Sequence, residues 1–158
     1  MTHQEGIIRC LMAILGQNNE VVSAFSRGNP FDKLLRSYDE FNSIGEPLYK
    51  AERAKKHYKM SVKAYESGLK VKELYGEHRI PLSVIRKRLL ESNRTYEVIS
   101  SILRENEVIL ITKEEAGTMD GALNKGGLGL RSVMPDDGKC RLEIAQILIA
   151  PATMLNKL

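Results

Sequence analysis

One long stretch of this chain without a helix-breaking residue constrains the predicted fold most. Between Pro47 and Gly68 the sequence contains neither proline nor glycine. Residues in this stretch and just beyond it recur at alternating spacings of three and four: Leu48, Ala51, Lys55, Tyr58, Val62, Tyr65 and Leu69. This spacing is typical of a helical seam that packs against a partner helix, and Lys55 is its one charged member. It predicts a helix that continues to Tyr75 and is about 42 Å long at 1.5 Å per residue.

The predicted long helix is also the most basic part of the chain. The 158 residues carry 24 Lys and Arg against 20 Asp and Glu, a formal charge of +4. Thirteen of the basic residues and only five of the acidic ones lie between Lys50 and Arg94, whereas the flanking segments are each net negative. A local excess of this size favours anionic partners, which means nucleic acid first and an acidic protein surface second.

Shorter elements are indicated on both sides of the long helix. Apolar residues at helical spacing predict five helices, over residues 7–15, 21–25, 31–41, 82–91 and 95–104. Thr95 is a suitable N-cap for the last of them. Residues 108–112 are short, β-branched and bounded by charge, which predicts a strand. Residues 142–149 are almost uniformly apolar, so they form a buried helix, a buried strand or a self-association surface.

The order of elements in residues 80–133 suggests a known type of architecture. These residues read as helix, short turn, helix, strand, glycine-rich hairpin and second strand. This order resembles a winged helix-turn-helix, a DNA-binding architecture whose second helix enters the major groove. The predicted fold class is therefore α+β and predominantly helical, with N-terminal helices that include the long basic helix, then a winged-helix-like helix-turn-helix with a short two-stranded sheet. The predicted regions are residues 1–76 and 77–158, either as two parts or as one compact domain.

The candidate nucleic-acid-binding residues come from three predicted surfaces. These surfaces are the basic ridge beside the seam of the long helix, the basic first helix of the helix-turn-helix, and its second helix together with the wing. In chain order the candidates are Arg53, Lys56, Lys59, Lys63, Lys70, Arg86, Lys87, Arg88, Arg94, Thr95, Tyr96, Ser100, Lys125 and Arg131. Contacts to phosphate would add salt-dependent affinity, and only contacts to base edges would specify sequence. Tyr58 and Tyr65 are candidates for base stacking, although tyrosines at seam positions more often belong to a core.

Other kinds of site are not indicated by the sequence. The glycine-rich run at residues 121–129 lacks the Gly-Lys-Ser/Thr order of a phosphate-binding P-loop, because Lys125 precedes its glycines. Cys10 and Cys140 belong to no C-x-x-C pair and the histidines show no ligand-like spacing, so no metal and no cofactor is expected. No catalytic residues are indicated, because no local spacing brings a nucleophile to a base. An enzyme built from distant residues remains open.

The leading functional hypothesis is a non-enzymatic, regulatory nucleic-acid-binding protein, with DNA favoured, that docks through its basic central region. The alternative is a protein-interaction module, an inhibitor or adaptor, whose basic helix binds an acidic surface of a partner, with Tyr49 or Tyr75 as anchors. A homodimer through the helical seam or the C-terminal apolar segment is a further expectation. The sequence contains no signal-peptide pattern and no run of 18 apolar residues, which predicts a cytoplasmic protein without a membrane partner.

Overall fold

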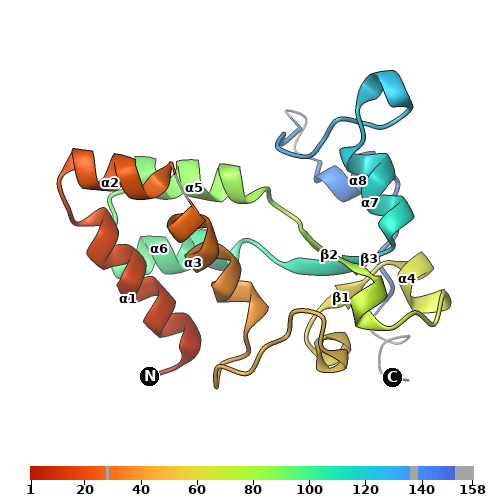
Figure 1. The fold of residues 1–158 in the computed structure, drawn as a ribbon, viewed down its shortest axis with the longest axis horizontal. Coiled ribbons are helices and arrows are strands. Elements are labelled where there is room, and N and C mark those ends of the chain that lie inside the picture. The colour runs from red at the N-terminus through yellow and green to blue at the C-terminus, as the bar shows by residue number, and fades with distance from the viewer. Residues whose placement is uncertain (28, 136–138, 152–158) are drawn as a thin grey trace. The chain divides into compact units, whose positions relative to one another are not determined.

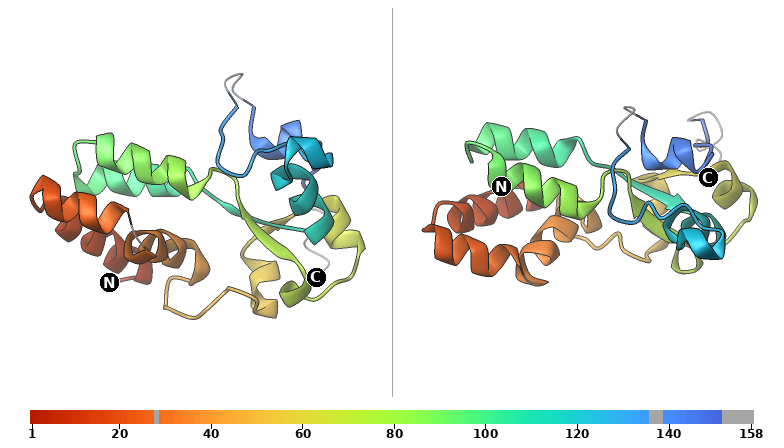
Figure 2. Two further views of the ribbon diagram at one scale, coloured as in Figure 1. Left: turned by 45° about the horizontal axis from the view of Figure 1, so that its top comes forward. Right: turned by 90° about the horizontal axis from the view of Figure 1, so that it is seen from above.

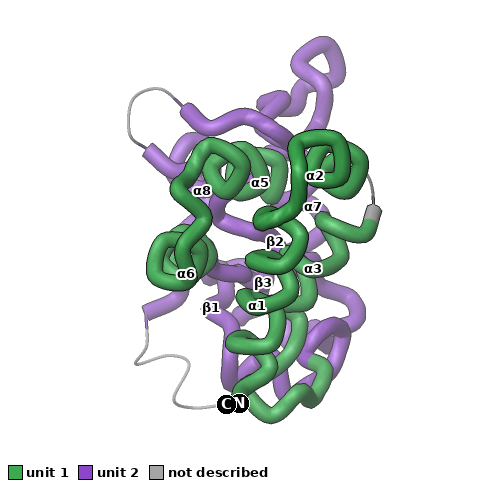
Figure 3. Tube along the Cα trace, turned by 90° about the vertical axis from the view of Figure 1, so that its left-hand side faces the viewer, with its two compact units in different colours: residues 1–47, 82–106 green, residues 48–81, 107–158 purple. Residues whose placement is uncertain are grey.

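The chain folds into two compact units. The computed structural model describes residues 1–27, 29–135 and 139–151. In this part of the chain the fold is α+β, with eight α-helices, three 3₁₀ helices and a three-stranded sheet. Unit 1 consists of residues 1–47 and 82–106, and unit 2 of residues 48–81 and 107–158 (Figure 3). Each unit is therefore built from two separate pieces of sequence.

Unit 1 is a bundle of five α-helices (Figure 1). They are α1 (His3–Leu15), α2 (Asn19–Ser26), α3 (Asn29–Glu40), α5 (Leu82–Glu91) and α6 (Tyr96–Arg104). α1 contacts α2, α3 and α6, and α5 contacts α3 and α6. Side chains from four of the helices are buried in its interior: Leu11, Leu15, Phe31, Leu35, Leu89 and Ile99. The five predicted helices are confirmed, and Thr95 caps α6 as predicted by accepting the backbone N–H of Val98 at 3.4 Å.

Unit 2 is built on a small mixed sheet. Its strands are β1 (Lys59–Met60), β2 (Tyr75–His78) and β3 (Val108–Ile111), in the order β1-β3-β2. β3 runs parallel to β1 and antiparallel to β2. The first residues of β1 and β3 and the last residues of β2 therefore meet at one end of the strands, called here the sheet edge. β3 is the strand predicted from sequence, but the sheet has three strands where two were predicted.

The two faces of β3 bury different apolar clusters. Successive side chains of a strand point to opposite faces, so Leu110 joins one cluster while Ile109 and Ile111 join the other. The Leu110 cluster includes residues from the 3₁₀ helix η1 (Glu52–Lys56), α4 (Val62–Glu66) and the 3₁₀ helix η2 (Val71–Glu73). The Ile109 cluster includes residues from α7 (Lys113–Asp120) and α8 (Arg141–Ile144), which lie on the other side of the sheet (Figures 1 and 2).

The predicted long basic helix is wrong. Residues 48–75 form η1, β1, α4 and η2 in succession, and Gly68, at φ +64°, follows α4 in the left-handed region. Most members of the predicted seam are only half-buried, and the residues that pack with Leu110 are instead Leu48, Ala54, Met60, Ala64, Val71 and Leu74. Helix propensity is weak compared with tertiary packing. Two contacts therefore decide the local structure. The backbone of Lys59 and Met60 pairs with β3, and the Ser61 hydroxyl caps α4 by accepting the Ala64 N–H at 3.0 Å.

The wing predicted after β3 is not a β-hairpin. In residues 112–135, all of them described, the chain forms α7, the 3₁₀ helix η3 (Leu123–Lys125) and irregular backbone. β3 takes its partners from β1 and β2, and the α5–α6 pair packs with α1 and α3 in unit 1. The two helices of the predicted helix-turn-helix are therefore confirmed, but the predicted wing is not. The wing was predicted wrongly because the order of elements along the chain does not reveal which core each element joins.

The apolar residues 142–149 combine two of the predicted alternatives. Leu142 lies in α8 and is buried together with Ile147 in the Ile109 cluster. The chain then runs beside β1, where Val62 N–H donates to the Leu148 carbonyl and Ala150 N–H to the Met60 carbonyl, each at 2.8 Å. Residues 147–150 therefore act as an irregular additional strand at the β1 edge of the sheet.

The glycines after α7 allow two backbone segments to touch. A Cβ atom at Gly127 would lie 2.2 Å from the carbonyl carbon and oxygen of Gly121, which are backbone atoms and cannot move aside cheaply. We therefore expect Gly127→Ala to lower the free energy of unfolding of unit 2 by about 1–3 kcal/mol, measured by urea denaturation followed by circular dichroism. Gly117→Ala is the matched control, because no atom beyond its own helix backbone and its chain neighbours lies within 4 Å of its Cβ position. It should stabilise α7 by about 0.5–1 kcal/mol. Equal effects of the two substitutions would contradict the close backbone contact.

Candidate functional site

The surplus positive charge of the chain belongs to unit 2. Unit 1 contains nine Lys and Arg and nine Asp and Glu, so its formal charge is zero. Unit 2 contains fifteen basic and eleven acidic residues, so it carries the whole +4. The predicted cationic surface is therefore divided. Seven candidates lie in unit 2, namely Arg53, Lys56, Lys59, Lys63, Lys70, Lys125 and Arg131, and seven lie in unit 1, namely Arg86, Lys87, Arg88, Arg94, Thr95, Tyr96 and Ser100.

The basic residues of α5 are paired with acidic side chains of unit 1. Arg86 Nη1 lies 3.0 Å from Asp32 Oδ1, and Arg88 Nη1 lies 2.7 Å from Glu105 Oε2. Lys87 Nζ approaches Glu91 Oε1 at 3.9 Å. These pairs place a carboxylate beside each basic side chain of α5 and so reduce the attraction of that helix for phosphate.

Several candidates around the start of α6 have structural roles. The Arg94 guanidinium donates to the carbonyls of Leu15 at 2.9 Å and Leu90 at 3.3 Å, where α1 and α5 end. Ser100 was expected on the outer face of α6, but only 5% of it is exposed, so the expectation is wrong for this residue. Tyr96 is half-buried and borders a shallow hollow with Arg104. An Arg94→Ala variant would therefore report on folding as much as on binding.

The basic candidates in residues 50–72 are exposed. This region, called here the basic segment, contains eight Lys and Arg and two Glu, and Arg53, Lys56, Lys63 and Lys70 are all at the surface. Its turns η1 and η2 contact each other. Glu52 joins them, since its carboxylate accepts the Val71 N–H at 2.8 Å and lies 3.4 Å from Lys55 Nζ. The backbone hydrogen bond is the main cause that lowers the pKa of Glu52, with Lys55 adding to it.

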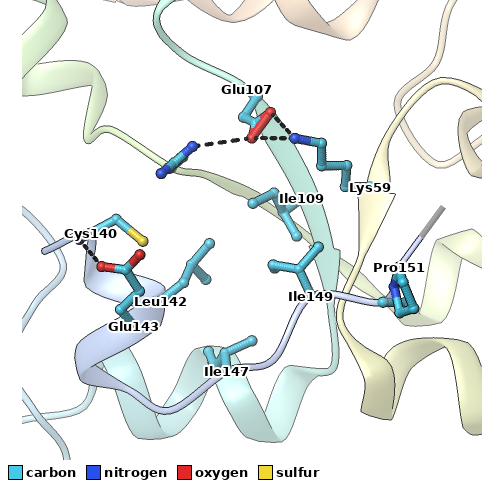
Figure 4. A pocket seen from close by; sticks show the side chains of 11 residues that line it. Lys59, Glu107, Ile109, Cys140, Leu142, Glu143, Ile147, Ile149 and Pro151 are labelled. Carbon is cyan, nitrogen blue, oxygen red and sulfur yellow. Dashed lines mark hydrogen bonds and ion pairs between the residues drawn. The ribbon is translucent and has the colours of Figure 1, made fainter.

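A cavity of about 360 Å³ opens at the sheet edge where β1 and β3 start and β2 ends (Figure 4). Three charged residues line one side of this sheet-edge pocket, each from a different neighbouring strand end. Lys59 Nζ lies 2.8 and 3.2 Å from the two carboxylate oxygens of Glu107, and Arg79 Nη1 lies 3.6 Å from Glu107 Oε2. Two cations thus share one carboxylate at this rim.

The other walls of the sheet-edge pocket come from β3, α8 and the segment that follows α8. Four aliphatic side chains, from Ile109, Leu142, Ile147 and Ile149, point into the space in Figure 4. Cys140 and Glu143 line the space from the α8 side, with the Cys140 N–H donating to the Glu143 carboxylate at 2.9 Å. Sequence reasoning missed this pocket, although Glu107 directly before a predicted strand was a usable signal. Arg79 could not be placed because β2 was not recognised.

A buried ion pair joins α8 to β2 in the same unit. Only 2% of Arg141 is exposed, and its guanidinium donates to the carboxylate of Glu77 on β2 and to the carbonyls of His78, Leu130 and Arg131. Asp120 Oδ1 lies 3.6 Å from Arg141 Nη1. Burial raises the pKa of Glu77, and the positive charge of Arg141 opposes that rise. The pair fastens the chain after η3 to the sheet and went unpredicted, because its partners are 64 residues apart.

Neither a metal centre nor a membrane span is found in the described residues. No three His, Cys, Asp or Glu side chains of residues 1–27, 29–135 and 139–151 converge in a way that could hold a metal ion. No helix in that part of the chain is both long and apolar enough to cross a bilayer. Comparisons of the chain with protein-family models, with curated proteins and with solved structures each gave no match.

Proposed function

We propose that this chain is a non-enzymatic nucleic-acid-binding protein that docks on the phosphate backbone through the basic segment of unit 2. The observation that carries the proposal is the confinement of the whole charge surplus to unit 2, with Arg53, Lys56, Lys63 and Lys70 exposed in its most basic part. Exposed ammonium and guanidinium groups that neutralise phosphates release condensed counterions and so supply sequence-independent affinity.

Exposed tyrosines beside the basic segment support contacts to bases. Tyr49 is 58% exposed, with Lys50 Nζ 5.0 Å from the centre of its ring, and Tyr75 is 43% exposed. Tyr58 instead packs against the Leu110 cluster and Tyr65 is half-buried. Aromatic rings next to cations are the usual stacking platforms for unpaired bases. In this proposal Tyr49 and Tyr75 take the stacking role first considered for Tyr58 and Tyr65.

The α5–α6 pair takes a secondary part in this proposal. It keeps the order of a helix-turn-helix, and Lys87 and Thr95 are exposed on it. Its unit has no net charge, so its contribution to affinity for DNA is smaller than that of the basic segment.

The protein-interaction alternative is favoured by one specific observation. Tyr49 stands exposed among basic residues, and tyrosine and arginine are enriched among the anchors of protein interfaces. An acidic protein partner would remain bound after nuclease digestion of a pull-down sample, whereas partners held through nucleic acid would be released.

The proposal predicts a local effect of charge removal. We expect a Lys56→Gln, Lys63→Gln, Lys70→Gln triple variant to bind labelled duplex DNA at least about tenfold more weakly and to lose about 2.7 from the slope of log affinity against log salt, at about 0.9 per phosphate contact. The measurement is fluorescence anisotropy with duplex and single-stranded oligonucleotides between about 50 and 200 mM salt.

A second triple variant in unit 1 provides the matched control. Lys33, Arg36 and Lys87 are exposed, and replacing all three with Gln changes the total charge by the same amount. We expect this variant to bind nearly as well as the unmodified protein. Equal weakening by both triple variants would mean that net charge, and not the basic segment, determines binding, and the proposed docking surface would be abandoned.

A further inference from the structure

We propose that the sheet-edge pocket binds a small organic acid, with a carboxylate held by Arg79 and Lys59 and an aliphatic body held against the four aliphatic walls. This inference goes beyond the proposed nucleic-acid binding and does not depend on it. It rests on the composition of the pocket, which places two cations at one rim and hydrocarbon surface behind them.

The charged rim favours an anion. Lys59 and Arg79 bring two positive charges to the rim, where Glu107 supplies one negative charge, so the rim itself has a surplus of one; the carboxylate of Glu143, elsewhere in the lining, balances the pocket as a whole. Lys59 is the close partner of Glu107 at 2.8 Å, whereas the Arg79 guanidinium is 3.6 Å away, a distance too long for a hydrogen bond. An arginine presents five N–H donors in a planar fork that matches the two oxygens of a carboxylate. Arg79 is therefore the residue placed to bind a second carboxylate.

The interior of the pocket determines what kind of tail and what size of ligand would fit. Ile109, Leu142, Ile147 and Ile149 offer only hydrocarbon surface, and burial of an aliphatic chain against them is favourable in proportion to the area removed from water. A cavity of about 360 Å³ is near the lower end of the range for small-molecule sites. Glu143 lines the pocket from α8 and would repel a second anionic group. An unbranched monocarboxylate of about eight carbons in total satisfies all three conditions.

The two cysteines of the chain allow this pocket to be tested directly. Cys140 lines the pocket and is partly exposed, whereas Cys10 is exposed on α1 in unit 1, and both are free thiols. The experiment measures the rate of maleimide modification at each thiol by mass spectrometry, with octanoate, octan-1-ol or octylammonium added at equal concentration. We expect octanoate to slow modification of Cys140 at least about fivefold, with the other two probes slowing it less than about twofold and Cys10 unchanged by all three.

Two variants and a direct titration separate anion recognition from simple apolar binding. Arg79→Gln should abolish the advantage of octanoate over octan-1-ol, while Lys125→Gln, which removes an exposed cation of the same unit that does not line the pocket, should retain it. Calorimetric titration of the unmodified protein with octanoate gives an answer that does not depend on thiol reactivity. Equal protection by all three probes, an unchanged preference in Arg79→Gln, or no saturable heat of octanoate binding would each overturn the assignment. None of these results would affect the oligonucleotide measurements on the basic segment.

Discussion

Replacing Arg141 with methionine is expected to lower the free energy of unfolding of unit 2 by about 3–5 kcal/mol, the usual cost of removing one partner of a buried ion pair. The side chain is 2% exposed and holds the Glu77 carboxylate, which is 7% exposed. Without the guanidinium this carboxylate is buried as an uncompensated charge. The carbonyls of His78, Leu130 and Arg131 lose a donor at the same time. Urea denaturation of the full chain, followed segment by segment with hydrogen exchange, gives the measurement.

The loss of folding stability in Arg141→Met should depend on pH in a defined direction. Burial already raises the pKa of Glu77, and removing the positive charge that opposes this rise should raise it further. For a carboxyl group whose folded-state pKa is raised, the folded state binds the proton more tightly than the unfolded state does. Its contribution to stability is present below the unfolded pKa of about 4.5 and is lost as pH rises through the folded pKa. The variant should therefore be less destabilised near pH 5 than near pH 8.

Two further variants control this prediction. Arg131→Met removes an exposed arginine ten residues earlier and should change stability by less than about 0.5 kcal/mol. A Glu77→Gln, Arg141→Met double variant removes both charges of the pair and leaves Asp120 in place. It should regain part of the stability lost in Arg141→Met and should lose the part of the pH dependence that Glu77 contributes. An Arg141→Met variant as stable as Arg131→Met at pH 8 would show that the pair does not hold the sheet to the chain after η3.

The elements that sequence predicted correctly are those specified by nearby residues. α3 and α6 each carry an apolar stripe and β3 is a continuous apolar run rich in β-branched residues, so their signals lie within a few residues of each other. β1 has only two residues, and it is a strand because β3, about fifty residues later, pairs with it. No local pattern contains that information. The same reason explains why an unbroken spacing from Leu48 to Leu69 predicted a helix that does not form.

For the candidate site, the sequence allowed only the charge and the solvent exposure of the basic side chains to be predicted. Long basic side chains such as Lys56 and Lys70 are expensive to bury, so their exposure follows from their chemistry. Arg141 looked like any other surface arginine, and its burial depends on Glu77 being placed beneath it by β2. The sheet-edge pocket depends in the same way on three strand ends that meet at one edge. Contacts between distant residues determine both features.

Phe31→Ala is the second variant expected to have a large effect, this time on unit 1. Phe31 is fully buried and is the largest apolar side chain that α3 contributes to the bundle. Truncating it removes its burial and leaves a cavity, which costs about 3–5 kcal/mol for a phenylalanine in a core. Hydrogen exchange should show reduced protection of α1, α3, α5 and α6, because these helices contact one another. Phe25→Ala is the control, since Phe25 is 40% exposed on α2 and its loss should cost less than about 1 kcal/mol.

The Phe31→Ala variant also separates the two surfaces that can carry nucleic-acid binding. The basic segment belongs to unit 2, whereas Lys87, Thr95 and Tyr96 lie on helices that depend on the core around Phe31. If the basic segment carries docking, the variant should bind duplex DNA within about threefold of the unmodified protein under conditions in which unit 1 is loosened. The Phe31→Ala variant could instead lose as much affinity as is expected for the Lys56, Lys63, Lys70 triple variant. That result would assign docking to the α5–α6 pair, because loosening those two helices would then have removed the binding surface.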